Sequence, residues 1–298
     1  MPMADGIHRE RRPGMTTNRV VLVDAVPMSA RVAAVPDPRS VIIAIHGGAT
    51  SSAYFDCPNR PDLSLLRAGA AAGHTVVALD RPGYGASGLY QDQLDDPSRR
   101  VALACGAVDK ILADSPRGAG LFFFAHSLGG ELALRMIVDR DDVVGLELAG
   151  TGLRHQPEAA EILDTATLTH RPSGLRELLW APYDLYPPEV LTGALSAPSV
   201  AYEATVIANW ARRGFAEVAA RVRVPVQYSV AEHERVWDTS TEALAAICGL
   251  FAASPRVKVN HVPASGHNLS VGLSAQSYHR RVLSFLEESI DMKEAEVG

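Results

Sequence analysis

Short apolar runs alternate with longer segments of helical periodicity from about residue 19 to residue 290. The apolar runs are rich in β-branched residues and end in Gly, Pro or polar residues, which is typical of buried parallel strands. The predicted strands cover residues 19–24, 30–35, 41–45, 75–79, 121–124, 143–148, 224–230 and 257–262. The predicted helices cover residues 63–72, 97–113, 129–139, 239–253 and 274–288. This alternation predicts an α/β fold with a mostly parallel central sheet flanked by helices.

The alternation stops between residues 152 and 221. This segment is helical and polar at first and is then interrupted by prolines. We interpret it as a helical cap inserted between two parts of one core, at residues 19–151 and 222–290. Residues 1–18 are predicted to be a flexible arm and residues 291–298 a C-terminal tail. Because functional loops follow the carboxyl ends of parallel strands, the cap is expected to cover the functional edge of the sheet.

Composition narrows the possible functions. The chain has 298 residues, 47% of them hydrophobic, which is enough for a sizeable core. A net charge of -6 argues against a nucleic-acid-binding protein. Three cysteines and an N-terminus unlike a signal peptide favour a cytoplasmic protein, and the lack of a long apolar run argues against membrane association. The sequence has neither metal-ligand spacing nor a phosphate-binding glycine motif, so we expect no metal and no cofactor.

The most informative segment lies between a predicted strand and a predicted helix, where residues 125–130 read Ala-His-Ser-Leu-Gly-Gly. A serine hydroxyl becomes an effective nucleophile when a base removes its proton during attack. A sharp strand-to-helix turn exposes such a serine and requires small residues two positions to either side, as Ala125 and Gly129 are. We therefore predict that Ser127 is a nucleophile and that the Leu128 N–H stabilises an oxyanion at the helix start.

The chain resembles the α/β-hydrolase superfamily at this serine and at four further places. His-Gly-Gly at residues 46–48 follows the third strand, where the family's oxyanion motif begins. Residues 80–87, Asp-Arg-Pro-Gly-Tyr-Gly-Ala-Ser, are similar to the family's D-x-P-G-x-G-x-S loop, and Ser-Gly-His at 265–267 resembles its histidine loop. Glu234 lies nine positions after Pro225, an offset usual for the family's acid. The resemblance spans nearly the whole chain and implies the α/β-hydrolase fold.

This resemblance implies a catalytic triad in the chain order Ser127, Glu234 and His267. His267 is expected to act as general base and then general acid, while Glu234 orients its imidazole. The sequence departs from the family at the acid, since residues 231–234 read Ala-Glu-His-Glu where Gly-Glu-x-Asp is common. Glu232 is therefore the alternative acid. No acidic residue follows the predicted sixth strand, which is the family's other usual position for it.

The loop after the third strand is expected to supply the second oxyanion donor. Gly48 N–H is the first choice, to pair with Leu128 N–H, and Ala49 is the alternative because the Gly-Gly-Ala run could be offset by one residue. His46, at the start of the same loop, is included among the predicted substrate-binding residues.

The predicted cap is rich in large aromatic residues. Residues 152–221 contain five of the chain's eleven Trp and Tyr residues and no Lys. Binding pockets are lined mainly by apolar and aromatic groups, although such residues can also pack cap helices onto a core. The residues predicted to contact substrate are Trp180, Tyr183, Tyr186 and Trp210. They favour a medium-sized, largely apolar substrate over a phosphorylated or highly charged one.

These observations predict a serine hydrolase that cleaves a carboxylic ester or thioester through an acyl-enzyme. Its expected partner is a small-molecule substrate. The alternatives on the same triad are an acyltransferase or cyclase and a hydrolase of lactones or carbon–carbon bonds. A ligand receptor built on this fold is the non-enzymatic alternative.

Overall fold

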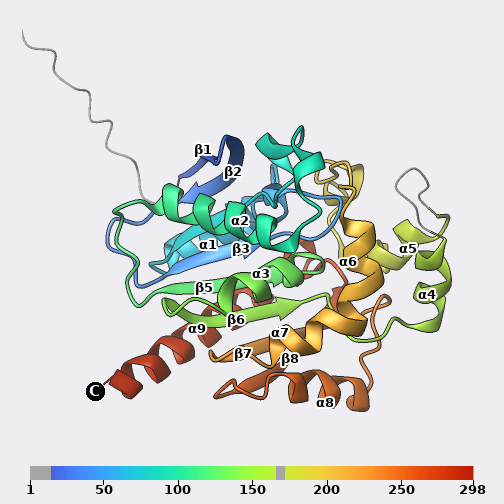
Figure 1. Cartoon of the computed structure of the whole chain (residues 1–298). Helices are drawn as coiled ribbons and strands as arrows, with labels where there is room; N and C mark the ends of the chain where they lie inside the picture. The colour runs from blue at the N-terminus through green and yellow to red at the C-terminus, as the bar shows by residue number, and fades with distance from the viewer. Residues whose placement is uncertain (1–14, 166–171, 298) are drawn as a thin grey trace, which may run out of the picture.

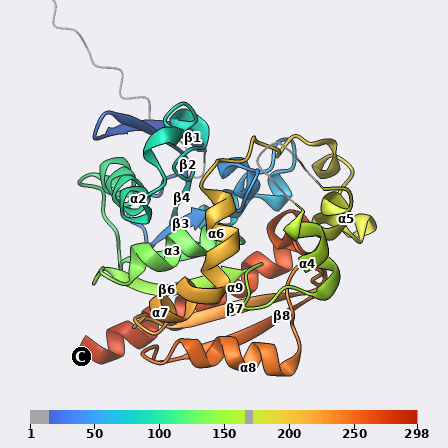
Figure 2. The ribbon, with the colours of Figure 1, turned by 45° about the vertical axis from the view of Figure 1, so that its right-hand side comes forward.

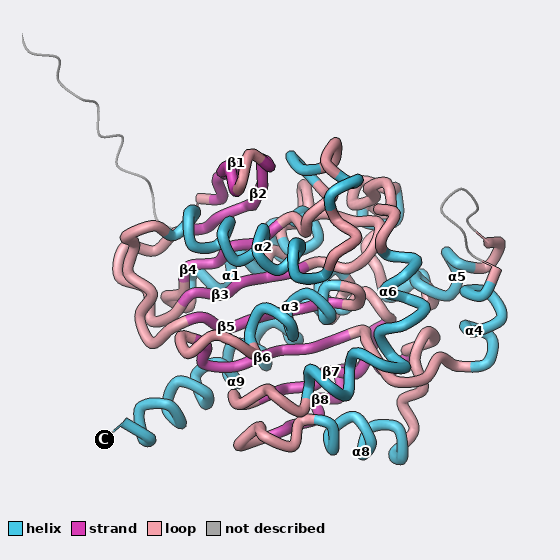
Figure 3. Tube along the Cα trace, in the orientation of Figure 1, coloured by secondary structure: helices cyan, strands magenta, loops and turns pink. Residues whose placement is uncertain are grey.

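The computed structural model describes residues 15–165 and 172–297 (Figure 1). Eight strands form one sheet in the order β1-β2-β4-β3-β5-β6-β7-β8. The strands are β1 (Thr16–Val23), β2 (Val26–Ala33), β3 (Val41–Ile45), β4 (Thr75–Leu79), β5 (Leu121–His126), β6 (Val143–Ala149), β7 (Val226–His233) and β8 (Val257–Gly266). The pairs β1–β2 and β2–β4 are antiparallel, and all later neighbours are parallel. Figure 3 shows the sheet running from β1 at the top to β8 at the bottom.

Helices cover both faces of this sheet. They are α1 (Leu65–Ala71), α2 (Pro97–Leu112), α3 (Gly129–Ile137), α4 (Pro157–Asp164), α5 (Leu175–Trp180), α6 (Glu203–Asn209), α7 (Phe215–Ala219), α8 (Thr241–Leu250) and α9 (Ala275–Val297). Residues of α2, α3, α7 and α8 belong to one hydrophobic core, and residues of α1 and α9 belong to the core on the opposite face. The central strands β3 and β4 are therefore almost entirely apolar, because both of their faces are buried.

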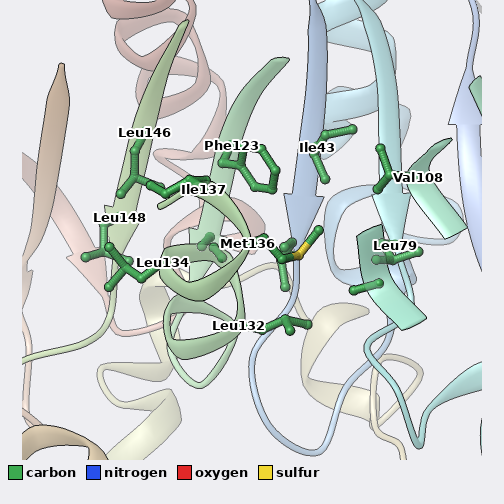
Figure 4. Packing of buried hydrophobic residues seen from close by; sticks show 14 of the residues in the cluster. Ile43, Leu79, Val108, Phe123, Leu132, Leu134, Met136, Ile137, Leu146 and Leu148 are labelled. Atoms are coloured by element: carbon green, nitrogen blue, oxygen red, sulfur yellow. The ribbon is translucent and has the colours of Figure 1, made fainter. Parts of the chain in front are cut away.

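The alternation of side chains along β5 divides it between the two cores. Phe123 packs in the core beneath α3, whereas Phe122 and Phe124 point to the opposite face. There Phe122 lies 6.2 Å from Phe285 of α9 between ring centroids. Figure 4 shows the first of these cores, with Leu132, Leu134, Met136 and Ile137 of α3 over Ile43, Phe123, Leu146 and Leu148 of the sheet.

The chain between β6 and β7 forms α4 to α7, in the region predicted as a cap. Figures 1 and 2 place α4 and α5 beyond one end of the sheet, with α6 between them and α3. A five-residue π-helical turn, Trp210–Gly214, joins α6 to α7. The α7 helix packs on the core through buried Phe215 and Val218. The two strands that flank this region, β6 and β7, pair directly with each other, so the insertion leaves the sheet continuous.

Both predicted chain ends need correction. The edge strand β1 begins at Thr16, within the predicted arm, while residues 1–14 lie outside the described part of the chain. The predicted tail is helical, since α9 continues to Val297. Ile290, within this helix, is buried in the core, and the residues that follow are mostly good helix formers.

Strands β7 and β8 extend further than predicted at their carboxyl ends. The β7–β8 pairing continues to His233 opposite Gly266. Since Glu234 and His267 are the next residues on each strand, they leave the sheet side by side.

Candidate active site

Ser127 lies in a strained turn between β5 and α3. Its φ is 51°, in the left-handed region, and its N–H donates to Ala149 O over 2.8 Å. The turn brings the start of α3 against the end of β3, where a Cβ added at Gly129 would lie 2.5 Å from the carbonyl oxygens of Ile45 and His46. Only glycine fits there. Ser127 itself keeps partial exposure to solvent, whereas every residue of β5 before it is buried.

Glu234 and His267 form a buried pair. His267 Nδ1 lies 3.0 Å from each carboxylate oxygen of Glu234, and both side chains are less than 5% exposed. The carboxylate also accepts the Val236 N–H over 2.8 Å, which fixes its orientation. Glu234 thus holds the imidazole by Nδ1, and Nε2 lies on the side of the ring away from the carboxylate.

Glu232 is placed differently. It is exposed, and its carboxylate accepts the Ala264 N–H over 2.7 Å, so it braces the start of the histidine loop from outside. The geometry favours Glu234 as the partner of His267, as the nine-residue spacing from Pro225 indicated.

Ser127 and His267 border the same short segment at the end of β6. Ser127 N–H is bonded to Ala149, and a Cβ on the next residue, Gly150, would lie 3.2 Å from His267 Cε1. His126 connects them further, because its ring centroid is 5.1 Å from that of His267. Burial lowers the pKa of His126 well below its ordinary value, and the nearby His267 lowers it further. His126 therefore remains neutral beside the serine.

The two predicted oxyanion loops are in contact. A Cβ added at Gly48 would lie 2.8 Å from Leu128 Cδ1, so the loop after β3 packs against the residue that follows Ser127. The Ala49 N–H donates to Tyr84 Oη over 2.9 Å and is thus engaged within the protein. Because Gly48 packs against Leu128 and the Ala49 N–H is already engaged by Tyr84, Gly48 is favoured over Ala49 as the second donor.

The prediction that His46 contacts substrate is wrong. The side chain has no exposed surface, and both ring nitrogens are occupied. Nδ1 lies 2.8 Å from Gly47 O, and Nε2 accepts the Arg81 N–H over 3.1 Å. Burial, with a further contribution from Arg81, lowers the pKa of His46 well below its ordinary value. His46 joins the loops after β3 and β4 as a neutral residue.

The four aromatic residues predicted to contact substrate occupy different environments. Trp210 is buried against Phe215, with stacked ring centroids 5.5 Å apart, and Arg135 lies over its ring, so it belongs to the core. Tyr183 is exposed beside Arg176. Substrate contact is therefore not supported for Trp210, because packing against the core buries almost all of its side chain.

Tyr186 and Trp180 lie nearer the histidine loop. Tyr186 is buried, and its hydroxyl accepts the Asn268 N–H over 3.1 Å, next to His267. Trp180 is half-buried and makes an edge contact with Tyr186 at 5.3 Å between centroids. The Asn268 side chain also donates to Leu179 O over 2.9 Å. The segment 179–186 thus holds the loop that carries His267.

Sequence reasoning did not identify Trp237. Its indole N–H donates to Gly150 O over 2.8 Å, which places this aromatic side chain next to the segment shared by Ser127 and His267. It also contacts His155, at 4.3 Å between ring centroids. Its position three residues after the predicted acid was the available signal.

Within residues 15–165 and 172–297, no group of three or more His, Cys, Asp or Glu side chains is arranged to hold a metal ion. In the same part of the chain, every helix is too short or too polar to cross a bilayer.

A family model described as the alpha/beta hydrolase family matches residues 42–281. The chain therefore belongs to the alpha/beta hydrolase family, and its eight-stranded sheet has the corresponding fold. No curated protein matches the chain in sequence.

Solved structures share the fold at low sequence identity. A membrane phospholipase A described as a bacterial virulence factor is 18% identical with a TM-score of 0.69, over 93% of this chain and 87% of that one. A soluble variant of monoglyceride lipase from Saccharomyces cerevisiae is 13% identical with a TM-score of 0.67, over 92% and 95%. A thermostable carboxyl esterase from Bacillus coagulans is 17% identical with a TM-score of 0.64, over 92% and 99%.

Proposed function

We propose that this hydrolase cleaves a carboxylic ester or thioester of a medium-sized, largely apolar substrate through an acyl-enzyme on Ser127. One observation carries the proposal. A serine held at φ 51° on a strand-to-helix turn shares the edge of the sheet with a buried histidine–carboxylate pair. This combination supplies a nucleophile, a base and an orienting acid.

The proposed reaction begins when Ser127 Oγ attacks the acyl carbon while His267 takes its proton. The carboxylate of Glu234 stabilises the imidazolium that forms. The N–H groups of Leu128 and Gly48 stabilise the developing oxyanion. His267 then protonates the leaving alcohol or thiol, and water releases the acyl group by the same steps in reverse order.

The substrate class rests on two observations. The three structures named above are described as a phospholipase, a monoglyceride lipase and a carboxyl esterase, and all three names refer to acyl esters. Two half-buried indoles near the site offer apolar surface: Trp180 contacts Tyr186, which holds the histidine loop, and Trp237 donates to Gly150 O.

A series of p-nitrophenyl esters of increasing chain length tests this function. We expect steady turnover with an optimum at intermediate length, and hydrolysis that added alcohols or amines do not accelerate. Acceleration with formation of a transferred product would indicate an acyltransferase. Saturable binding of the esters with no turnover of any of them would overturn the proposal in favour of a ligand receptor.

A further inference from the structure

A buried carboxylate from the segment between β6 and β7 lies against the oxyanion loop. Glu203, the first residue of α6, is only 5% exposed. Its carboxylate forms an ion pair with Arg81, which precedes it by 122 residues in the sequence, and accepts the Tyr84 hydroxyl over 2.8 Å. Arg81 is itself 2% exposed. Because both charged groups are largely shielded from water, each is stabilised mainly by the other.

Both partners of Glu203 also form hydrogen bonds with the loop after β3. Arg81 Nη2 donates to Gly47 O over 2.9 Å, and Tyr84 Oη accepts the Ala49 N–H over 2.9 Å. A Cβ added at Gly48 would lie 3.5 Å from Glu203 Oε1. The residues on both sides of Gly48 are therefore held by groups that Glu203 binds, and the carboxylate lies directly beside Gly48.

The protonation states support this chain of hydrogen bonds. Burial raises the pKa of the Tyr84 hydroxyl above its ordinary value, so the group keeps the proton that it donates to Glu203. Burial alone would lower the pKa of Arg81, but its interactions with Tyr202 and Glu203 raise it overall. A buried ion pair of this kind is costly to break, because the remaining partner becomes an unpaired buried charge.

We propose that Glu203 is a positioning residue for the oxyanion hole, acting through Arg81 and Tyr84 on the peptide that carries the Gly48 N–H. This inference rests on the proposed function. Oxyanion stabilisation depends on donors placed in advance at the position of the developing charge, and displacements of about 1 Å are costly. A substitution in α6 should therefore change the chemical step, although α6 belongs to the region predicted as a cap.

Glu203→Gln keeps the size of the side chain and removes its charge. We expect kcat for a short ester to fall by roughly ten- to a hundred-fold, less than the loss of an entire oxyanion donor. The KM should change by less than about two-fold, because a short ester makes few contacts with α6. Inhibition by a trifluoromethyl ketone, whose tetrahedral adduct places an oxyanion in the hole, should weaken by the same factor as kcat.

Glu131→Gln is the matched control. Glu131 is also buried and paired with arginines, at 3.3 Å from Arg100 and 2.6 Å from Arg135, and its carboxylate bonds to these arginines and not to residues 47–49. It should lose thermal stability as Glu203→Gln does, yet keep kcat at temperatures where it is folded. If Glu203→Gln does not fold, Tyr84→Phe removes the hydroxyl between Glu203 and Ala49 without leaving a charge unpaired. That variant should lose kcat by about ten-fold.

The rate at which a fluorophosphonate labels Ser127 distinguishes a failure of the proposed hydrolase function from a failure of the positioning role of Glu203. A wild-type protein that neither reacts with the probe nor hydrolyses any ester would overturn the proposed function and this role together. A reactive wild type with an equally reactive and fully active Glu203→Gln variant would overturn only the positioning role. Equal losses of kcat in Glu203→Gln and Glu131→Gln would also overturn it, since general loosening would then explain both.

Discussion

His267 and Glu234 meet through one nitrogen and two oxygens, each oxygen 3.0 Å from Nδ1. This relationship follows from the sheet, because β7 and β8 stay paired up to the residues immediately before them. The same carboxylate also accepts the Val236 N–H, which holds the glutamate side chain in this position. The imidazole is thereby held before any substrate arrives, which is what a general base requires.

Glu234→Gln should therefore leave the protein folded and lower kcat by about 10³–10⁴-fold, as removal of the orienting carboxylate does in other triads. Glu232→Gln is the control, and we expect a loss of about ten-fold or less because this residue is exposed and only braces Ala264. Kinetics of both variants on one ester check the assignment. The reverse order of effects would transfer the orienting role to Glu232.

Tyr186→Phe should weaken the support of the histidine loop. The change leaves the Asn268 N–H without its buried acceptor, which costs about 1–3 kcal/mol in the free energy of unfolding. Because the neighbouring residue is His267, kcat should fall several-fold while chain-length preference stays the same. Urea unfolding and the ester series measure the two effects. A shift in chain-length preference with unchanged kcat would mean that Tyr186 contacts substrate instead.

Two tryptophans of the region between β6 and β7 should respond differently. Trp210→Ala removes a buried core side chain and should lower the free energy of unfolding by about 3–5 kcal/mol, without changing chain-length preference. Trp180→Ala, at a half-buried position, should shift KM along the ester series while Ser127 still reacts with a small probe. If Trp180→Ala altered only stability, the substrate contact proposed for this residue would be wrong.

Stability should also depend on pH through Glu147, a fully buried carboxylate of β6. Burial raises its pKa to about 8, despite hydrogen bonds from Tyr278 and Gln227. Between the ordinary glutamate pKa and about 8, the folded protein keeps a proton that the unfolded chain loses, so stability falls as pH rises. The slope is at most about 1.4 kcal/mol per pH unit.

Glu147→Gln imitates the protonated form and should remove this contribution. Compared with the variant, the wild type should lose free energy of unfolding from pH 5 to pH 8 and show a constant difference above pH 8. Urea denaturation at pH 5 to 9 makes the comparison. Parallel pH profiles for the two proteins would show that Glu147 is ionised throughout this range.

The elements that the sequence predicts best are those whose residues share one environment. The runs 41–45 and 75–79 are buried on both faces, and the predicted boundaries of these strands are confirmed at both ends. The turn at Ser127 could be predicted because it depends on local requirements, above all Gly129 beneath the ends of β3. Glu234 and His267 follow strands, so their positions could be inferred from the strand order.

Contacts between distant segments could not be predicted in the same way. In the sequence Glu203 is an ordinary polar residue of the predicted cap, and its role depends on Arg81, which only the folded chain brings to it. His46 has the sequence context of a binding residue, but burial between two loops decides its role. Likewise, whether Trp210 packs on the core or faces substrate depends on Phe215 and Arg135, and helical periodicity contains no information on either contact.

The most direct test of the account is the reaction of Ser127 with a fluorophosphonate, followed by intact mass and by ester hydrolysis. The wild type should gain one adduct and lose its activity. Ser127→Ala should fold normally, since alanine tolerates the φ of 51° no worse than serine does, gain no adduct, and lose activity by several orders of magnitude. An adduct on Ser127→Ala, or hydrolysis by it at the wild-type rate, would contradict the assignment of Ser127 as the nucleophile.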